Sequence, residues 1–274
     1  MSEAPRKIAI LAGAGALPEE VAAACEAKRI PYLVIDLDGA AGPWAAARGA
    51  VRLALGQVGR LLEMLRAEGC EAVVMAGGLR RPELSRIRMD WQGVRMLPRV
   101  ARLFRQGDDA LLRGIAGLFE EQGFAVLAPD ALLDRGLAEA GVLGAVAPDA
   151  SAQADMAEAS AILAALSPHD VGQAVVVAGG VCLAMEAAEG TAQMVARVAG
   201  LRQGWEAREG VLVKRPKTAQ DRRVDLPAIG PETVAACAAA GLAGIGVEAG
   251  GTFVLRREAT VAAADAAGLF VFGL

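Results

Sequence analysis

The amino-acid sequence predicts an α/β protein of two tandem domains, the first a Rossmann-like parallel sheet and the second a further, mixed α/β domain. In the first half, short apolar runs such as residues 7–12 and 72–76 alternate with amphipathic helical stretches. Continuous apolar strands separated by helices are typical of a parallel sheet covered on both faces. A Gly-, Ala- and Pro-rich connection at residues 130–149 separates two halves of ordinary domain size. We therefore predict domains at residues 1–132 and 133–274, with the functional site in the cleft between them.

Hydrophobic periodicity places the individual elements of both halves. In the first half we predict strands at residues 7–12, 31–37, 72–76 and 124–127, and helices at residues 17–29, 56–68 and 107–121. In the second half we predict helices at residues 151–166, 191–199, 230–240 and 257–267, and strand-like segments at residues 172–177, 180–185, 211–214, 244–248 and 252–255. A polar run at residues 215–225 interrupts the second half.

The composition limits the classes of protein to consider. Hydrophobic residues make up 54% of the chain and aromatic residues 4%, which indicates a folded core of Ala, Val, Leu and Ile. The net charge of −4 lacks the basic excess of a protein that binds duplex nucleic acid, so we expect no nucleic-acid partner. The longest uncharged stretches have 15 residues, whereas a membrane span takes about 20. With no signal-peptide pattern, the chain is expected to be cytoplasmic.

The cysteine and histidine content narrows the chemistry further. Cys25, Cys70, Cys182 and Cys237 are scattered without a C-x-x-C pair, so each is expected to be a small buried hydrophobe in a reducing compartment. His169 is the single histidine and is expected to lie in a loop. Zinc sites with two or three histidines are excluded, and no G-x-S-x-G motif accompanies the histidine. Catalysis would rest on carboxylates, Lys, Arg, backbone amides or a bound cofactor.

A glycine turn follows the first predicted strand. Gly13, Ala14 and Gly15 stand where a backbone without Cβ lets phosphate oxygens approach the amides of a helix N-terminus. Pro18 occupies the place of the third glycine of a dinucleotide-binding fingerprint, and Asp36 lies near the position of a ribose-binding acid. A nicotinamide- or flavin-dependent oxidoreductase and a tight turn without a ligand are both consistent with this pattern.

A second close-approach point follows the third predicted strand at the same edge of the sheet. It consists of Gly77 and Gly78, with Arg80 and Arg81 beside them. The two arginines either bind an anion or are solvated loop charges.

The polar residues of the second half lie in two clusters. Glu186, Glu189 and Thr191 lie between a strand-like run and a helix, where Thr191 would cap the helix and the glutamates would hold a hard cation or take a proton from water. Lys214 begins a cationic stretch that leads to Asp225. Cations beside carboxylates suit a phosphorylated ligand with a divalent metal. A helix cap with solvated acids and a solvated charged face remain the alternatives.

These segments, taken in order, resemble the LpxI-type UDP-2,3-diacylglucosamine pyrophosphatases of lipid A synthesis, over nearly the whole chain. The E-A-x-E-G-T block at residues 186–191 and the R-V-D-L-P-x-I-G block at residues 223–230 are the most diagnostic. At residues 56–60 the chain has G-Q-V-G-R where many relatives have a G-x-F-G-K-like segment. The other matching segments are residues 13–18, 81–82, 107–112, 170–173, 214–216 and 241–245.

The resemblance implies a metal-dependent hydrolase that is assisted by Mg²⁺. It would direct water at the β-phosphate and release UMP and 2,3-diacylglucosamine 1-phosphate, known as lipid X. The substrate would lie between the domains, and the enzyme would be a homodimer. Peripheral contact with the cytoplasmic face of the inner membrane would rest on the lipid of the substrate rather than on basic patches, with an acyl groove among the Ala- and Leu-rich helices of the second half.

The resemblance also implies roles for individual residues. Asp225 matches the essential aspartate of the family, and Lys214 is expected to meet the pyrophosphate charge. The expected catalytic residues are Asp225, Lys214 and Glu189, and the expected metal ligands are Asp225, Glu186 and Glu189. The expected substrate contacts are Gly13, Ala14, Gly15, Gly78, Arg81, Asp108, Asp109, Gly190, Thr191 and Arg223. A nucleotide-cofactor oxidoreductase and a non-catalytic module that binds a nucleotide sugar or lipid stay open as alternatives.

Overall fold

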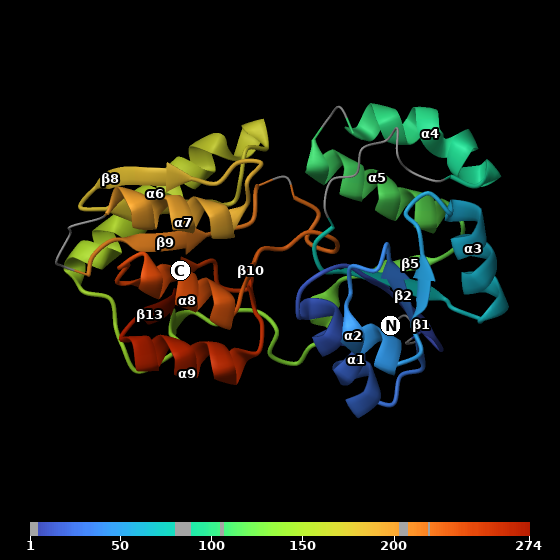
Figure 1. Ribbon diagram of the computed structural model, residues 1–274, viewed down its shortest axis with the longest axis horizontal. Helices are drawn as coiled ribbons and strands as arrows, with labels where there is room; N and C mark the ends of the chain where they lie inside the picture. The colour runs from blue at the N-terminus through green and yellow to red at the C-terminus, as the bar shows by residue number, and fades with distance from the viewer. Residues whose placement is uncertain (1–4, 80–88, 105–106, 203–207, 219) are drawn as a thin grey trace. The chain divides into compact units, whose positions relative to one another are not determined.

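The computed structural model describes residues 5–79, 89–104, 107–202, 208–218 and 220–274. The chain forms two compact units, which Figure 1 shows coloured along the sequence. The first unit consists of Met1–Asp134 together with Arg223–Asp225, and the second of Arg135–Arg222 together with Leu226–Leu274. Each unit has its own sheet and its own hydrophobic core.

The sheet of the first unit is entirely parallel. Its strands are β1 (Ile8–Ala12), β2 (Tyr32–Leu37), β3 (Val51–Leu53), β4 (Ala72–Ala76) and β5 (Ala125–Leu127). Their order is β3-β2-β1-β4-β5, with every neighbouring pair parallel. This is the strand order of a doubly wound α/β fold, in which ligands bind outside the carboxyl ends of the strands. The predicted parallel sheet is confirmed.

Helices cover both faces of this sheet. They are α1 (Leu17–Ala27), α2 (Pro43–Ala47), α3 (Val58–Ala67), α4 (Trp91–Phe104) and α5 (Asp108–Glu121), with a 3₁₀ turn at Pro129–Ala131. Leu62 and Leu65 of α3 and Phe119 of α5 enter the core on one face. Helix α1 contacts β1, β2 and β4, where the alternate strand residues are buried as well. Helix α4 packs on α3 and α5 rather than on the sheet.

The second unit contains a mixed sheet in the order β6-β13-β11-β9-β7-β8. Strands β9, β11 and β13 are parallel, β7 is antiparallel to both of its neighbours, and β6 is antiparallel to β13. A separate two-stranded parallel pair is formed by β10 and β12. The bounds are β6 (Gly141–Val142), β7 (Ala174–Ala178), β8 (Val181–Met185), β9 (Val211–Lys214), β10 (Ala228–Ile229), β11 (Gly244–Val247), β12 (Phe253–Val254) and β13 (Phe270–Gly273).

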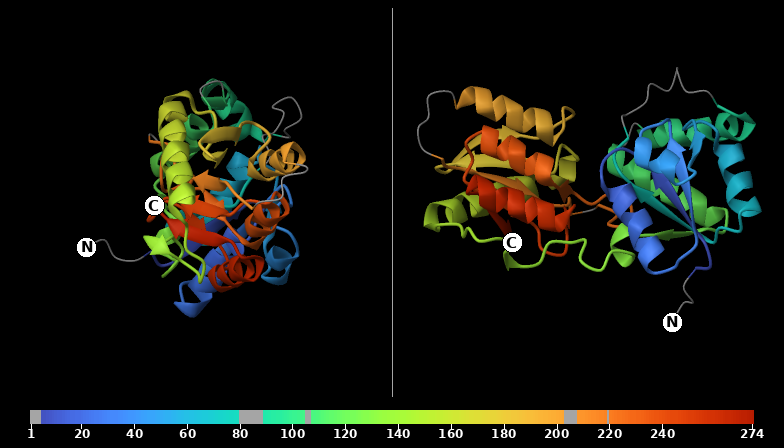
Figure 2. Two further views of the ribbon diagram at one scale, coloured as in Figure 1. Left: turned by 90° about the vertical axis from the view of Figure 1, so that its left-hand side faces the viewer. Right: turned by 60° about the horizontal axis from the view of Figure 1, so that its bottom comes forward.

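Four helices sandwich this sheet, and Figure 2 shows α6 on one side and the helices that follow it on the other. They are α6 (Ala150–Leu166), α7 (Thr191–Leu201), α8 (Pro231–Ala239) and α9 (Arg257–Ala267). Met156 and Leu163 of α6 pack on one face, and Val195 of α7 and Cys237 of α8 belong to the core on the other. The second α/β domain is therefore confirmed as a mixed one.

Three of the four cysteines are buried as predicted, namely Cys25, Cys70 and Cys237. Burial raises the pKa of the Cys237 thiol to about 12. The prediction is wrong for Cys182, which is exposed. It lies on β8, the edge strand beside β7, where Val181 and Met185 are exposed as well.

His169 lies at the end of a 3₁₀ turn, Ser167–His169, and is exposed, as the sequence predicts for a loop residue. In the part of the chain that the structure describes, no helix combines the length and the apolar character that a membrane span requires.

Candidate active site

The charged residues of the second unit gather at one edge of its sheet. Strands β8, β9 and β11 run in the same direction, so their carboxyl ends meet at this edge. Glu186 follows β8, Arg215 follows β9 and Glu248 follows β11. Gln173 precedes the antiparallel β7 and therefore lies at the same edge. Outside the carboxyl ends of strands is where α/β sheets place their ligands.

A hydrogen-bond network centred on Gln173 ties this edge together. One carboxylate oxygen of Glu186 accepts the Thr191 hydroxyl at 2.6 Å, and the other accepts the Gln173 backbone N–H at 3.1 Å. The Gln173 carbonyl accepts the backbone N–H of Arg215 at 3.0 Å, and its side-chain oxygen accepts from Gln220 at 3.4 Å. The network thus joins the segment that leads into α7 to the polar run after β9.

The start of α7 differs from the sequence prediction in one respect. Thr191 was expected to cap this helix, but the N-cap residue is Gly190, with φ +81°, and no side chain caps the helix. The Thr191 hydroxyl donates to Glu186 instead. The prediction of the cap is therefore wrong, because a glycine with positive φ makes the turn and Thr191 becomes the first helical residue.

Glu189 lies in the same turn and is held as an anion. Its carboxylate forms an ion pair with Arg197 at 3.0 Å. A hydrogen bond from its own backbone N–H, followed by the hydrogen bond from Arg197, lowers the pKa of Glu189 below its ordinary value. The carboxylate is consequently ionised at neutral pH.

Three cations follow one another at the end of β9. Lys214 is buried, with 7% of its surface exposed, and its ammonium donates to the Ala228 carbonyl at 3.1 Å. Two N–H groups of Arg215 donate to one oxygen of Glu248, at 2.9 and 2.8 Å. Lys217 forms an ion pair with Asp170. Three positively charged side chains, each with a partner, therefore lie within four consecutive residues at the end of one strand.

A recess of about 250 Å³ lies beside two of these cations, Arg215 and Lys217, within the second unit. Arg215, Lys217 and Arg222 supply its basic lining, and Ser167, Thr218 and Gln220 supply hydroxyl and amide groups. Its lining therefore combines positive charge with hydrogen-bond donors, the groups that bind phosphate.

The corresponding edge of the first unit is closed by backbone. The Ala14 N–H donates to the Gly78 carbonyl at 2.8 Å, and the Gly78 N–H donates to the Ala14 carbonyl at 2.9 Å. A Cβ on Gly77, whose φ is +86°, would lie 2.5 Å from the Ala14 carbonyl oxygen, and one on Gly13 would lie 2.6 Å from the Gly78 oxygen. Gly15, with φ +99°, faces open space. Gly13 and Gly77 are thus required by the close approach of two strand ends.

Asp36 at the end of β2 is also occupied by its own chain. It is 4% exposed, and its two oxygens accept the Ala41 N–H at 3.0 Å and the Arg52 guanidinium at 3.2 Å. The carboxylate therefore fixes the loop after β2. A role for Asp36 in binding the ribose of a dinucleotide finds no support in this geometry.

Arg223 and Asp225 lie in the three-residue segment that belongs to the first unit. Arg223 forms an ion pair with Glu120 of α5 at 2.6 Å, and Val224 packs against the core of that unit. Lys214, by contrast, belongs to the second unit. From the sequence, Asp225 and Lys214 were expected in one cluster of the second domain, whereas the structure assigns them to different units.

The remaining first-half candidates lie around α5. Asp109 is buried, with 8% of its surface exposed, and forms an ion pair with Arg113 at 2.9 Å. Asp108 is the first residue of α5. The side chain of Asp108 and the whole of Arg81 lie outside the described residues.

Models of known protein families match both halves of the chain. The family model for the LpxI N-terminal domain matches residues 7–135, and the model for the LpxI C-terminal domain matches residues 139–272. This chain belongs to the LpxI family. The curated protein UDP-2,3-diacylglucosamine pyrophosphatase LpxI of Caulobacter vibrioides is 42% identical over 273 residues, which cover 98% of each LpxI chain. The resemblance stated from the sequence blocks is confirmed.

One solved structure shows only a weak likeness to this chain. The biotin carboxylase domain of the Hydrogenobacter thermophilus 2-oxoglutarate carboxylase has a TM-score of 0.26 and 10% identity, covering 77% of this chain and 44% of that one. The score is too low to carry an argument about fold or function.

The expected metal ligands of this chain do not form a complete metal-binding site. Among the described residues, no three His, Cys, Asp or Glu side chains lie together so that they could hold a metal ion. Both oxygens of Glu186 already accept hydrogen bonds, and Glu189 is paired with Arg197. Mg²⁺ usually takes only one or two carboxylates together with substrate phosphates and waters. The carboxylate of Asp225 is the type of hard oxygen donor that fits such a site.

Two features of this edge of the second sheet were not predicted from the sequence. Neither the Arg215–Glu248 ion pair nor the bridging position of Gln173 was predicted. The available signal was positional, because Glu248 directly follows β11 just as Arg215 follows β9. Comparing the residues that follow each predicted strand would have found the pair.

Proposed function

We propose that this LpxI family member hydrolyses the pyrophosphate bond of UDP-2,3-diacylglucosamine to UMP and 2,3-diacylglucosamine 1-phosphate. The observation that carries the proposal is the match along both domains to a protein named for this activity, at 42% identity. The cationic edge of the second sheet supports it, since a pyrophosphate diester carries negative charge that such a lining can bind.

Lys214 and Arg215 take the role of charge stabilisation in this proposal. Lys214 is held by the sheet and by the Ala228 carbonyl, so its ammonium is positioned before the substrate arrives. A preorganised cation in a site shielded from water stabilises charge that develops on a leaving group. We assign Lys214 to the phosphate of the departing UMP, while Glu248 holds Arg215 at the recess.

Asp225 takes the role of orienting or deprotonating the attacking water. A carboxylate can accept the proton of a water directed at the β-phosphate, which makes the phosphate of lipid X the acceptor of the new oxygen. Mg²⁺, when bound, would neutralise charge on the pyrophosphate oxygens. The proposed donor to Mg²⁺ from this chain is Asp225, and Glu186 and Glu189 act on the geometry of the turn before α7.

Other features of the proposal rest on the family resemblance alone. They are binding of the substrate between the domains, an acyl groove among the helices of the second domain, a homodimer, and action at the cytoplasmic face of the inner membrane. Gly15 and Gly190 are the glycine positions proposed to contact the substrate through their backbone groups.

UMP release from UDP-2,3-diacylglucosamine in H₂¹⁸O, with Mg²⁺ and then with EDTA, tests the reaction. We expect release that depends on Mg²⁺, with the label in lipid X. Label in UMP would move the attack to the α-phosphate. Tight binding of the substrate without UMP release would identify a binding module instead and contradict the proposal.

Asp225→Asn tests the role of that carboxylate. We expect kcat to fall roughly 10³-fold, the middle of the usual range for a general base. Substrate affinity should stay within about tenfold, or about 1.4 kcal/mol, because the variant keeps the shape of the side chain. Full activity in Asp225→Asn would overturn the assignment.

A further inference from the structure

The exposed face of α4 has an unusual composition. Trp91 is 76% exposed and Val94 is 49% exposed. At 3.6 residues per turn, Arg95, Pro98 and Arg102 fall on the same side of the helix as Trp91, and all three are exposed. Arg99 lies at the margin of this face. The helix therefore presents an aromatic ring, aliphatic surface and three arginines, with no acidic residue among them.

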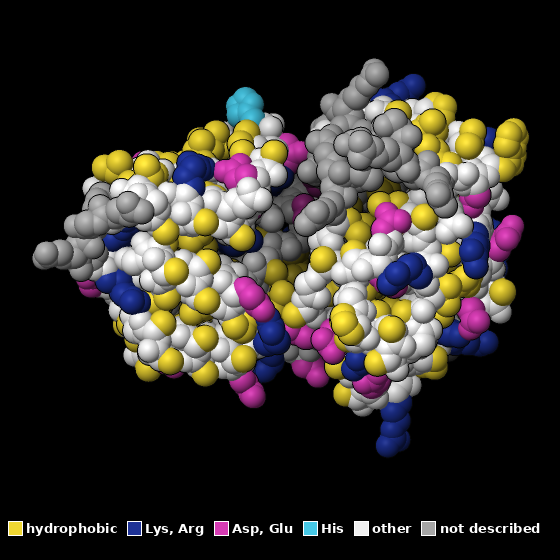
Figure 3. Space-filling view, in the orientation of Figure 1, with side chains coloured by type: hydrophobic (Ala, Val, Ile, Leu, Met, Phe, Trp, Pro, Cys, Tyr) yellow, Lys and Arg dark blue, Asp and Glu magenta, His cyan; other side chains and the backbone are white. Residues whose placement is uncertain are grey.

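The charges of this face are largely uncompensated. Arg99 binds both oxygens of Glu121, at 2.7 and 2.6 Å. Arg95 and Arg102 make no ion pair with any described residue. Asp90, the acidic residue just before the helix, accepts the backbone N–H groups of Gly93 and Arg60 and so is used as a cap. Figure 3 shows basic and hydrophobic side chains beside one another over α4.

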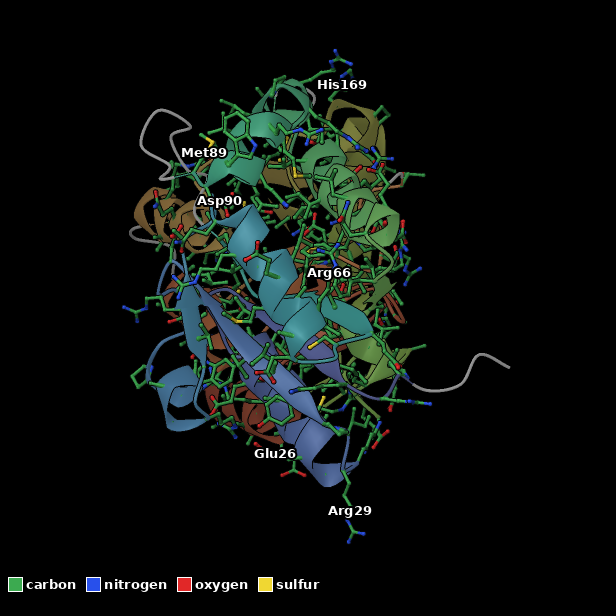
Figure 4. All side chains as sticks on the ribbon, turned by 90° about the vertical axis from the view of Figure 1, so that its right-hand side faces the viewer. Glu26, Arg29, Arg66, Met89, Asp90 and His169 are labelled. Atoms are coloured by element: carbon green, nitrogen blue, oxygen red, sulfur yellow. The ribbon has the colours of Figure 1, made fainter. Side chains whose placement is uncertain are left out.

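Helix α4 is anchored on α3 and α5. Asp90 joins the first turn of α4 to the first turn of α3, since it accepts an N–H group from each at 2.8 and 3.1 Å, and Figure 4 shows it beside the start of α3. A Cβ on Gly93 would lie 2.4 Å from the Gly56 carbonyl oxygen, and one on Gly114 would lie 2.2 Å from Leu103. These close contacts fix α4 on α3 and α5, so its outer face is a fixed surface.

The charge of this region contrasts with that of the whole chain. Helix α4 contains three arginines and no acidic residue, whereas the net charge of the protein is −4. A local positive region on an acidic protein favours an anionic partner over general association with any surface.

We propose that the exposed face of α4, formed by Trp91, Val94, Arg95, Pro98, Arg99 and Arg102, docks on an anionic lipid surface. The proposal rests on the proposed function, because a diacyl substrate has to be collected from a membrane. Arginines flanking Trp and aliphatic residues suit the interface of a bilayer, where the charges meet anionic headgroups and the apolar groups enter the boundary with the acyl chains. This assigns membrane contact to a basic patch, in addition to the substrate lipid expected from the sequence.

A second copy of the chain fits this face less well. A symmetric dimer through α4 would bring the arginines of both copies together. Like charges placed opposite one another oppose such an interface.

Vesicle flotation with the full chain tests the docking surface. Vesicles of phosphatidylcholine alone are compared with vesicles that also contain phosphatidylglycerol. We expect binding to the anionic vesicles that weakens with added salt. Arg95→Gln/Arg102→Gln should lower the partition coefficient roughly 20-fold, since each arginine near an anionic surface contributes about fivefold.

A matched control removes the same charge elsewhere on the first unit. Arg6→Gln/Arg29→Gln changes two exposed arginines, and Figure 4 places Arg29 at the opposite end of the unit from Asp90. This control should bind within about twofold of the original chain. Equal losses in both double variants would show general charge attraction and overturn the proposal, as would equal binding to neutral and anionic vesicles.

Trp91→Ala tests the apolar part of the face. It should weaken binding to anionic vesicles several-fold, because a large aromatic surface no longer enters the interface. Leu201→Ala removes a comparable exposed apolar residue, 58% exposed, in the second unit and should have no such effect. A loss in Leu201→Ala equal to that in Trp91→Ala would contradict the assignment of this face.

Two further readouts separate this proposal from the proposed function. UMP release from a short-chain, water-dispersed substrate should be the same in the original chain and in Arg95→Gln/Arg102→Gln. If no chain releases UMP while vesicle binding still depends on Arg95 and Arg102, the proposed function fails and the docking surface stands. A change in the sedimentation of the lipid-free protein in the double variant would make α4 a contact between copies and overturn the lipid proposal.

Discussion

The two sheets of this protein use their carboxyl edges in different ways. In the first unit, β1 and β4 continue beyond their ends through reciprocal backbone hydrogen bonds between Ala14 and Gly78. In the second unit, the strand ends carry charged side chains, with Lys214 as the last residue of β9, Arg215 directly after it, and Glu248 after β11. The edge of the first sheet is therefore occupied by backbone hydrogen bonds, whereas the edge of the second sheet presents positively charged side chains.

This difference qualifies the usual interpretation of a glycine turn after a strand. Such turns often place phosphates at a helix N-terminus. Here Gly13 and Gly77 are explained by contacts below 3 Å that any Cβ would make with the opposite backbone. Gly15 and Gly78, by contrast, have open space where a Cβ would lie. A glycine motif therefore identifies a place of close approach, and the charges around it decide whether the neighbour is a ligand or the chain itself.

Gly77→Ala should disrupt the backbone contact between the ends of β1 and β4 and have the largest effect on stability. A Cβ at this position combines a positive φ with a clash against the Ala14 carbonyl oxygen at 2.5 Å. We expect a loss of about 3 kcal/mol in the free energy of unfolding, measured by urea unfolding. Gly15→Ala is the control, since it has a positive φ but no neighbour within 4 Å. It should lose only about 1 kcal/mol; equal losses would contradict the account of Gly77.

Thr191→Val tests the hydrogen bond between Thr191 and Glu186 at the edge of the second sheet. The change keeps the shape of the side chain but removes the hydroxyl that donates to Glu186 at 2.6 Å. We expect a loss of about 1 kcal/mol in the free energy of unfolding. Thr191→Ser should restore most of it because the donor returns. If Thr191→Ser is as unstable as Thr191→Val, the hydrogen bond to Glu186 is not the cause.

The pH dependence of stability at Glu189 should give the smallest effect. Its own backbone N–H and Arg197 lower its pKa in the folded chain, so it favours folding above the unfolded-state pKa, and this contribution disappears as pH falls through the folded-state pKa. Glu189→Gln should therefore have a lower urea midpoint than the original chain at pH 7. The gap should close as pH falls from about 5 towards 3. A gap that stays constant over this range would exclude a role for the ionised carboxylate.

The sequence predicted most of the regular structure because its strands are short, apolar and bounded by glycine. Six elements of the described structure were not predicted, namely α2, β3, α4, β6, β10 and β13. The strands among them have only two to four residues, α2 has five, and α4 contains Pro98 and an arginine-rich outer face. For such elements tertiary contacts, rather than local pattern, decide the conformation.

The candidate site was predictable in its residues and less so in its geometry. Lys214 and the block around Glu186 were found from residue types and the resemblance. The partners were not, because the pairing of Arg215 with Glu248 and of Glu186 with Gln173 depends on strand direction in a mixed sheet. The grouping of Asp225 with the first unit depends on the return of the chain to that unit, which no local pattern encodes.

The contrast between the two edges is tested most directly by kcat/KM for UMP release in two variants that each remove one cation. Lys214→Met removes the ammonium at the second edge, and Arg52→Gln removes the guanidinium beside Asp36 in the first unit while keeping an amide donor. After urea unfolding has shown both to be folded, we expect roughly a 100-fold loss for Lys214→Met. Arg52→Gln should stay within about threefold, because its charge serves the Asp36 carboxylate. Activity retained in Lys214→Met, or an equal loss in Arg52→Gln, would contradict the assignment of substrate binding to the second edge.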